Sequence, residues 1–164
     1  MIAETRADGR SLVLRERRDA DQCPDDSSEW DDWDSGERVP GDHHRAVILL
    51  DGVIIGTMSW HAVHYGPTVG SRAWSMGIAL APPWRGQGWG TIAQRALADH
   101  LLGSAHRVEA CTDVDNVAEQ RSLAKAGFVR EGVLRQAQAR ADGMHDLVMY
   151  ARVRQSTAPT TLTG

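Results

Sequence analysis

Phosphate-binding chemistry is suggested by three glycines within five residues, Gly86, Gly88 and Gly90. They follow an apolar run that ends at two prolines, and a segment with apolar residues at helical spacing comes after them. A glycine-rich turn between a strand and a helix can hold a phosphate, because bare backbone N–H groups and the helix dipole face the anion. A Walker loop would need a lysine before Thr91, and a dinucleotide fingerprint would need a glycine in place of Thr91. The loop therefore predicts anion binding of another kind.

Proton-transfer chemistry could come from several side chains. Glu109 lies in a strand-like segment, and His61 and His64, which follow an Asp-Gly turn, carry the side chain that most often transfers protons near neutral pH. A water relay without a dedicated base is an alternative for all three. The adjacent His43 and His44 have no third ligand nearby at a useful spacing, so we expect no metal site.

Length and composition indicate an ordinary soluble domain. The chain has 164 residues, 41% apolar and 24% charged, with two cysteines and a net charge of −4. It has neither an apolar run of roughly 18 residues, as a membrane span needs, nor a signal-peptide core. We expect a cytoplasmic protein without disulfides, and a pI of about 5.9 without a basic cluster disfavours direct nucleic-acid binding.

The negative charge is concentrated in one acidic segment, residues 19–37. It holds nine of the 22 acidic residues and no lysine or arginine, so the rest of the chain carries 13 acids against 18 bases. A solvated loop would explain this composition. Trp30 and Trp33 also lie in the segment, which favours a binding role for it.

The elements that must position these residues alternate along the chain. Strands are predicted at residues 11–17, at 44–50 and 53–63 around the Asp51-Gly52 turn, at 72–80 and at 107–114. Helices are predicted from Thr91 to Leu102, ending at Gly103, and from Asn116 to Gly127. Residues 128–137 and 145–153 are predicted to form a closing hairpin. The pattern predicts one mixed α/β domain over residues 1–154, with the acidic segment as an insert, and a disordered tail over 155–164.

Two motifs resemble a known family. Residues 85–90, RGQGWG, match R/Q-x-x-G-x-G/A, the pyrophosphate signature of GNAT acetyltransferases, and lie between a strand and a helix as that family requires. Residues 116–135, NVAEQRSLAKAGFVREGVLR, are similar to a block of the RimJ/RimL branch, which acetylates ribosomal-protein N-termini. The resemblance covers roughly residues 9–153, least well at 19–44. It implies a mostly antiparallel sheet, splayed between the fourth and fifth predicted strands, with helices on both faces.

The resemblance also implies an acetyl-CoA site. The backbone of one strand end would pair with the pantetheine arm, the glycine loop would hold the pyrophosphate, and an asparagine would meet the pantetheine near the thioester. The cofactor-binding residues implied are Ile78, Ala79, Leu80, Arg85, Gly86, Gln87, Gly88, Trp89, Gly90, Thr91 and Asn116.

The implied reaction is direct attack of an amine on the thioester, without a covalent enzyme intermediate. Cys111 is therefore interpreted as a small buried strand residue. The branch places serine three residues after the asparagine, near the leaving thiolate, and this chain has Glu119 there. Other GNAT enzymes place a tyrosine acid where this chain has Leu123. Glu119 either completes a capping box with Asn116, which we favour, or serves the sulfur; Ser122, on the same helical face, is a further candidate, and Glu109 is the candidate base.

Three functions are compatible with the sequence. The first is an acetyl-CoA-dependent N-acetyltransferase, working as a monomer or homodimer on a primary amine. The others are a non-catalytic acyl-CoA-binding module and an acidic interaction protein. In this superfamily the segment after the first strand forms a wall of the acceptor site, so the acidic segment favours a cationic acceptor, either a peptide N-terminus or an amine-bearing small molecule or antibiotic. The predicted acceptor-binding residues are Trp30, Asp31, Trp33, Asp34 and His61.

Overall fold

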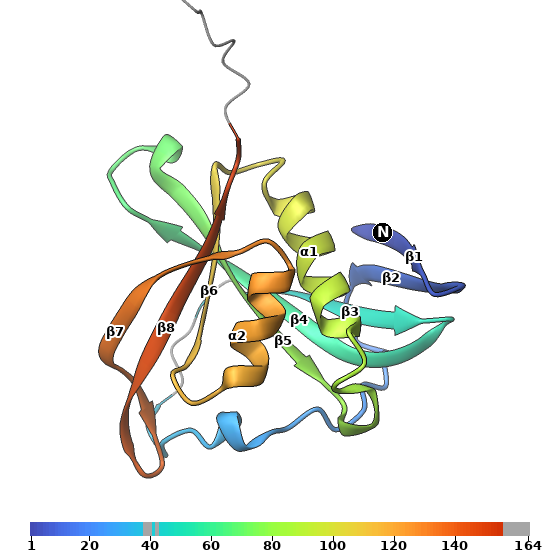
Figure 1. Ribbon diagram of the computed structural model, residues 1–164, viewed down its shortest axis with the longest axis horizontal. Helices are drawn as coiled ribbons and strands as arrows, with labels where there is room; N and C mark the ends of the chain where they lie inside the picture. The colour runs from blue at the N-terminus through green and yellow to red at the C-terminus, as the bar shows by residue number, and fades with distance from the viewer. Residues whose placement is uncertain (38–40, 42, 156–164) are drawn as a thin grey trace, which may run out of the picture.

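A single eight-stranded sheet organises the molecule. The computed structural model describes residues 1–37, 41 and 43–155, and the strand order is β1-β2-β3-β4-β5-β6-β8-β7 (Figure 1). The strands are β1 (Ala3–Ala7), β2 (Arg10–Glu16), β3 (His44–Leu50), β4 (Val53–His64), β5 (Arg72–Leu80), β6 (Arg107–Asp113), β7 (Val129–Arg140) and β8 (Gly143–Val153). The helices are α1 (Trp89–Leu101) and α2 (Val117–Lys125), with short 3-10 turns η1 (Glu29–Asp31), η2 (Val69–Ser71) and η3 (Pro82–Trp84).

The sheet opens between β5 and β6, its one parallel pair. The antiparallel ladder of β4 and β5 runs the full length of β5, whereas β5 and β6 pair only at Trp74↔Val108 and Ser75↔Glu109. Beyond Ser75 the two strands diverge, which leaves the second half of β5 with one unpaired edge. The predicted mixed sheet, splayed at this position, is confirmed.

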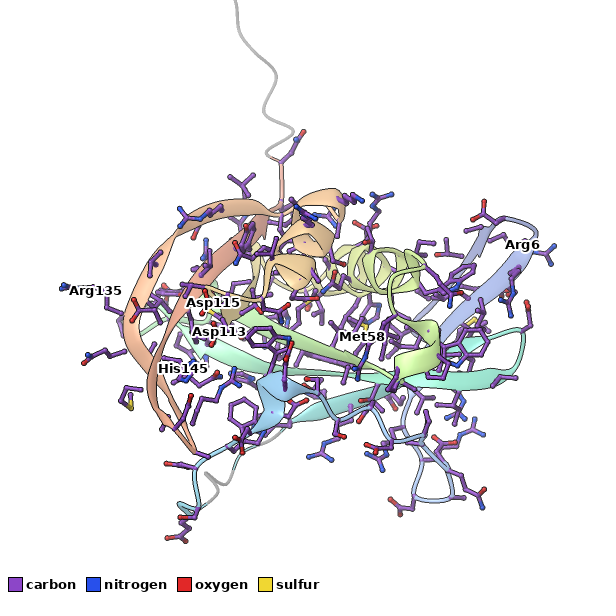
Figure 2. All side chains as sticks on the ribbon, turned by 60° about the horizontal axis from the view of Figure 1, so that its bottom comes forward. Arg6, Met58, Asp113, Asp115, Arg135 and His145 are labelled. Atoms are coloured by element: carbon purple, nitrogen blue, oxygen red, sulfur yellow. The ribbon has the colours of Figure 1, made fainter. Side chains whose placement is uncertain are left out.

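The core lies between the sheet and the two helices. Leu14, Ile48 and Met58 are buried on the sheet side, and Ala93 and Leu97 on α1 pack into the same cluster. Figure 2 shows Met58 between the sheet and the helices, and the acidic segment on the other face. The two α-helices contact each other and cover one face, so the expectation of helices on both faces is wrong for the described residues. The acidic segment, with only the single turn η1, takes the second helical layer's place.

Local turn chemistry sets the hairpins. Asp51 and Gly52 have positive φ angles of 49° and 85°, as the predicted β3–β4 hairpin turn requires. Asp8 and Gly9 have the same combination, 50° and 74°, and join β1 to β2. The strand β1 was not predicted, because its sequence AETRA is short, has two charged residues among five and is at most half-buried at the sheet edge.

Both helices form where they were predicted, with shifted ends. α1 starts at Trp89, two residues before the predicted start, and ends at Leu101. Gly103 does not have a positive φ angle. Its backbone N–H donates to the carbonyl of His100. A Cβ at this position would lie 3.0 Å from the same carbonyl oxygen. Asn116 caps α2 and Gly127, at φ 92°, follows its end, as predicted. None of the described helices has the length and hydropathy to cross a membrane. The predicted tail lies, apart from Gln155, outside the described residues.

Candidate active site

The unpaired edge of β5 leads directly to the glycine loop. Ile78 and Ala79 lie on β5 beyond the last pair with β6, so this edge of β5 has no strand partner there. Leu80 is also there, but its carbonyl accepts a hydrogen bond of 2.7 Å from Arg85 Nε. An extended arm lying in the gap could pair with this edge as an added strand does.

The loop itself has the backbone that an anion cradle needs. Gly86 and Gly88 have φ angles of 72° and 87°, and a Cβ at either residue would meet no atom within 4 Å. Gly88 is the N-cap of α1 and offers no side chain, so the first N–H groups of the helix, at Trp89, Gly90 and Thr91, have no capping partner. A phosphate group bound at this turn would meet these N–H groups and the positive end of the helix dipole.

Two predicted cofactor residues have a structural role as well. The Arg85 guanidinium donates to the carbonyls of Asp26 and Ser27, at 3.1 and 2.8 Å, besides Leu80. These contacts link the acidic segment to β5, and the expected phosphate contact of Arg85 is not among them. The side chain of Trp89 is buried in the core, so only its backbone can face the cofactor.

A chain of polar side chains runs between the two helices. The hydroxyls of Thr91 and Ser122 are 3.0 Å apart, and Ser122 Oγ donates to Gln94 Oε1 at 2.7 Å. Gln94 is 1% exposed, and its amide nitrogen donates to Glu119 Oε1. Burial raises the pKa of Glu119 to about 7, against the opposing effect of the Gln94 hydrogen bond. The predicted loop residue Thr91 is thus linked to a carboxyl group that is partly protonated at neutral pH.

The favoured capping box does not form. Asn116 Oδ1 accepts the backbone N–H of Glu119 at 3.2 Å, so the asparagine is the predicted N-cap. The Asn116 N–H bonds the carbonyl of Asp113, and the Glu119 carboxyl turns to Gln94 instead of folding back. A buried amide on the neighbouring helix takes the place of the local partner. Leu123 is fully buried in the core and offers no acid.

Glu109 lies on the face of β6 opposite the helices, at the apex of the gap, where β5 and β6 begin to part. It is 4% exposed, and its Oε2 accepts hydrogen bonds from Tyr65 Oη at 2.7 Å and from Arg107 Nε at 2.9 Å. His61 is half-buried on the same face; burial first, and then the neighbouring His43, lower its pKa. His64 is exposed. Glu109 is therefore the predicted proton acceptor that the fold places closest to the parting strands.

Cys111 differs from its expected setting. It is exposed on the outer face of β6, two residues beyond Glu109, with its Sγ 3.6 Å from Met149 Sδ. The prediction of a buried strand residue is wrong, because the β5–β6 opening uncovers this part of β6.

The acidic segment crosses the face of the sheet that carries Glu109, and contacts at both of its ends hold it there. At one end Asp26 accepts the hydroxyl of Thr57 at 2.7 Å, beside the Arg85 contacts. At the other end the backbone of Trp33 forms an isolated antiparallel β-bridge with that of Arg140, whose guanidinium lies 5.2 Å from the centre of the Trp33 ring. The segment therefore joins the β5 side of the gap to the β7–β8 hairpin.

The hairpin is fastened in turn to the end of β6. His145 lies between Asp113, at 2.6 Å, and Asp142, at 2.7 Å, and Asp113 is 3.7 Å from Arg140 (Figure 2). These carboxylates raise the pKa of His145, with Asp142 the larger influence. An ionic cluster thus supports the far end of the acidic segment.

Several predicted acceptor residues already have partners. Asp31 Oδ2 accepts the N–H and hydroxyl of Ser28 in a capping box at η1, and Asp34 accepts the N–H of Gly36. Trp30 is half-buried, and Trp33 is 37% exposed. Among the predicted acids of the segment, Asp31 thus stabilises a local turn as well as carrying charge.

Gln94, Tyr65 and Arg140 are site residues that the sequence analysis missed. Gln94 alone carried a signal, since it is a polar residue beside Ala93 on the apolar stripe of a helix. Tyr65 and Arg140 act through partners more than 40 and 100 residues away, Glu109 and the Glu29 carbonyl, and no local pattern indicates such contacts. No group of three potential metal ligands occurs within the described part of the chain.

Comparison with known proteins gives one family and a set of related folds. A family model described as an acetyltransferase (GNAT) domain matches residues 5–129, from β1 to the start of β7, and so includes the whole gap and both helices. No curated protein sequence matches the chain.

Three solved structures illustrate the likeness. RimJ of Mycobacterium smegmatis, in complex with a CoA disulfide, has a TM-score of 0.61 and 26% identity, covering 68% of this chain and 53% of that one. RimL, a ribosomal L7/L12 alpha-N-protein acetyltransferase in complex with coenzyme A, has a TM-score of 0.60 and 27% identity, with 68% and 62% covered. The ribosomal-protein-S5-alanine acetyltransferase of Vibrio fischeri, at 22% identity and a TM-score of 0.61 over 71% and 64%, shares the fold. The chain thus spans between about half and two thirds of the length of these structures.

Proposed function

Because the chain belongs to the GNAT acetyltransferase family, we propose that it transfers an acetyl group from acetyl-CoA to a primary amine. The observation that carries this proposal is the continuous path from the unpaired β5 edge to the uncapped start of α1. A pantetheine arm along Ile78 and Ala79 would place its pyrophosphate at the loop of Gly86 to Thr91. The CoA-bound RimJ and RimL structures share this fold, which supports the same use of the gap. Asn116 would meet the pantetheine near the thioester while it caps α2.

We assign the proton acceptor to Glu109. The neutral amine attacks the thioester carbonyl, the C–N bond forms, and the oxyanion needs a donor, a role that an N–H group of the β5 edge would fill. Glu109 then takes the surplus amine proton. Tyr65 and Arg107 hold one of its oxygens, and the other accepts no hydrogen bond from the described residues.

We assign the proton donor to Glu119. As the C–S bond breaks, the thiolate requires a proton, and a carboxyl group with a pKa of about 7 carries one for part of the time at neutral pH. Gln94 fixes one oxygen of the carboxyl, and Ser122 fixes Gln94 in turn. Glu119 thereby occupies the position where the RimJ/RimL branch has its serine.

The acceptor that this site favours is cationic. The acidic segment lies on the Glu109 face, and its exposed acids Asp32 and Glu37 have no side-chain partner among the described residues. Such carboxylates raise the local concentration of a cation, and an indole such as Trp33 can hold one by a cation–π contact worth about 0.5–2 kcal/mol.

Calorimetry with acetyl-CoA, followed by a thiol-release assay with a panel of primary amines, tests the function. We expect acetyl-CoA binding and turnover of at least one amine. Glu109→Gln should lower kcat by roughly 10²-fold or more, with acetyl-CoA affinity unchanged. A chain that does not bind acetyl-CoA would refute the proposal, and a Glu109→Gln variant of normal activity would refute the assigned base.

A further inference from the structure

A cavity of about 630 Å³ lies beside the apex of the gap, on the face opposite the helices. It is bounded by the connection between β4 and β5, by the starts of β5 and β6, and by parts of β7 and β8. It is lined by Tyr65, Gly70, Ser71, Arg72, Ala73, His106, Arg107, Glu131, Gly132, Val133, Leu134 and Met149. Its volume is within the range of about 300–1,000 Å³ that small-molecule sites occupy.

Two lining residues contact the assigned base directly. Tyr65 and Arg107 both donate to Glu109 Oε2, at 2.7 and 2.9 Å. Glu109 pairs with Ser75 at the last position before β5 and β6 part. A third lining residue, Met149, contacts Cys111, the next residue on the same face of β6. The cavity therefore adjoins the place where an amine must lie to give its proton to Glu109.

The chemistry of the lining is largely apolar. Val133 and Leu134 are 42% and 40% exposed and, with Ala73 and Met149, present apolar surface to the cavity. Its acid is neutralised, because Arg107 Nη2 lies 2.6 Å from Glu131 Oε2, and its second guanidinium, Arg72, donates to the Ser104 carbonyl and lies 4.9 Å from the Trp74 ring. A cavity with apolar walls and no unpaired carboxylate suits an uncharged apolar group and does not attract a second cation.

We propose that this cavity receives the aryl or bulky alkyl body of the acceptor, whose primary amine lies at Glu109. The inference rests on the proposed acetyltransferase activity and narrows its substrate to a small arylalkylamine. The acidic segment would then steer the ammonium group, while the cavity discriminates among amines by their apolar part.

A larger side chain at the lining residue Gly132 would occupy the cavity. A Cβ at Gly132 would meet no atom within 4 Å, and its φ lies outside the left-handed region, so Gly132→Leu adds a side chain without backbone strain. Val129, on the same strand, is 69% exposed and lies outside the cavity. Val129→Leu is therefore the matched control.

The experiment compares 2-phenylethylamine with ethylamine in both variants and in the unaltered chain. We expect Gly132→Leu to raise the KM for 2-phenylethylamine at least tenfold, and to leave the KM for ethylamine and the acetyl-CoA affinity unchanged, with Val129→Leu behaving as the unaltered chain. Equal KM values for 2-phenylethylamine in all three proteins would overturn the inference. In parallel, calorimetry with 2-phenylethylamine in the presence of CoA should show binding that Gly132→Leu abolishes. If that binding occurs without turnover of any amine, the cavity is a site and the proposed function fails; absence of binding overturns the inference itself.

Discussion

Replacing Gly88 by valine separates the cofactor role of the glycine loop from its structural role. Gly88 and Gly52 have almost the same φ, 87° and 85°, and neither leaves a Cβ in contact with any atom within 4 Å. Valine at either position must adopt a left-handed conformation, which costs an L-residue roughly 1–2 kcal/mol. For a chain of this size, that corresponds to a fall in Tm of about 2–8 °C. Gly52→Val, in the β3–β4 turn, is thus a control with the same backbone strain.

The two variants should differ only toward acetyl-CoA. At position 88 the new side chain projects where the pyrophosphate would meet the uncapped N–H groups of α1. A hydrogen bond to a charged group contributes about 1.5–3 kcal/mol, so losing one should weaken binding by roughly ten- to two-hundredfold. Calorimetry and thermal melts on the same preparations measure both effects. Should Gly88→Val bind acetyl-CoA as tightly as Gly52→Val, the assignment of the loop to the pyrophosphate is wrong.

Three further predictions concern protons and charge. Burial raises the pKa of Glu119 from 4.5 to about 7, so the folded chain keeps a proton that the unfolded chain releases between these values. The free energy of unfolding should therefore fall as the pH rises across this range, by at most about 1.4 kcal/mol per pH unit. Glu119→Gln should remove that fall in denaturant titrations and should lower kcat by roughly 10²-fold. A variant with normal kcat would show that Glu119 is not the donor. Gln94→Leu removes the hydrogen bond that lowers the pKa of Glu119, so the alkaline limb of the kcat–pH profile should move upward, and an unmoved limb would contradict the link. Asp32→Asn should raise the KM for 2-phenylethylamine about two- to fivefold and weaken its salt dependence, whereas Asp31→Asn should also lower the Tm because it weakens the η1 capping box; unchanged salt dependence in Asp32→Asn would make the segment a solvated loop.

The sequence by itself determined the features that depend on neighbouring residues. The Asp51-Gly52 hairpin, the glycine loop before α1 and the Asn116 cap all formed as predicted, because positive φ angles and helix caps need particular residues at particular positions. The apolar stripe of α1 likewise predicted which side of the helix is buried, since helical periodicity is a local property. The family resemblance placed the opening of the sheet correctly.

Only the tertiary structure decided the partners of the polar side chains. The Glu119 carboxyl could cap its own helix or reach another one, and the arrival of Gln94 from α1 settled the choice. Arg85 belongs to a phosphate-loop motif, yet the acidic segment, some 58 residues away in sequence, supplies the carbonyls that its guanidinium binds. Cys111 is exposed because β5 and β6 part beside it. Competition among hydrogen-bond partners is resolved by distance and burial, and both are set by how remote elements pack, which no spacing along the chain encodes.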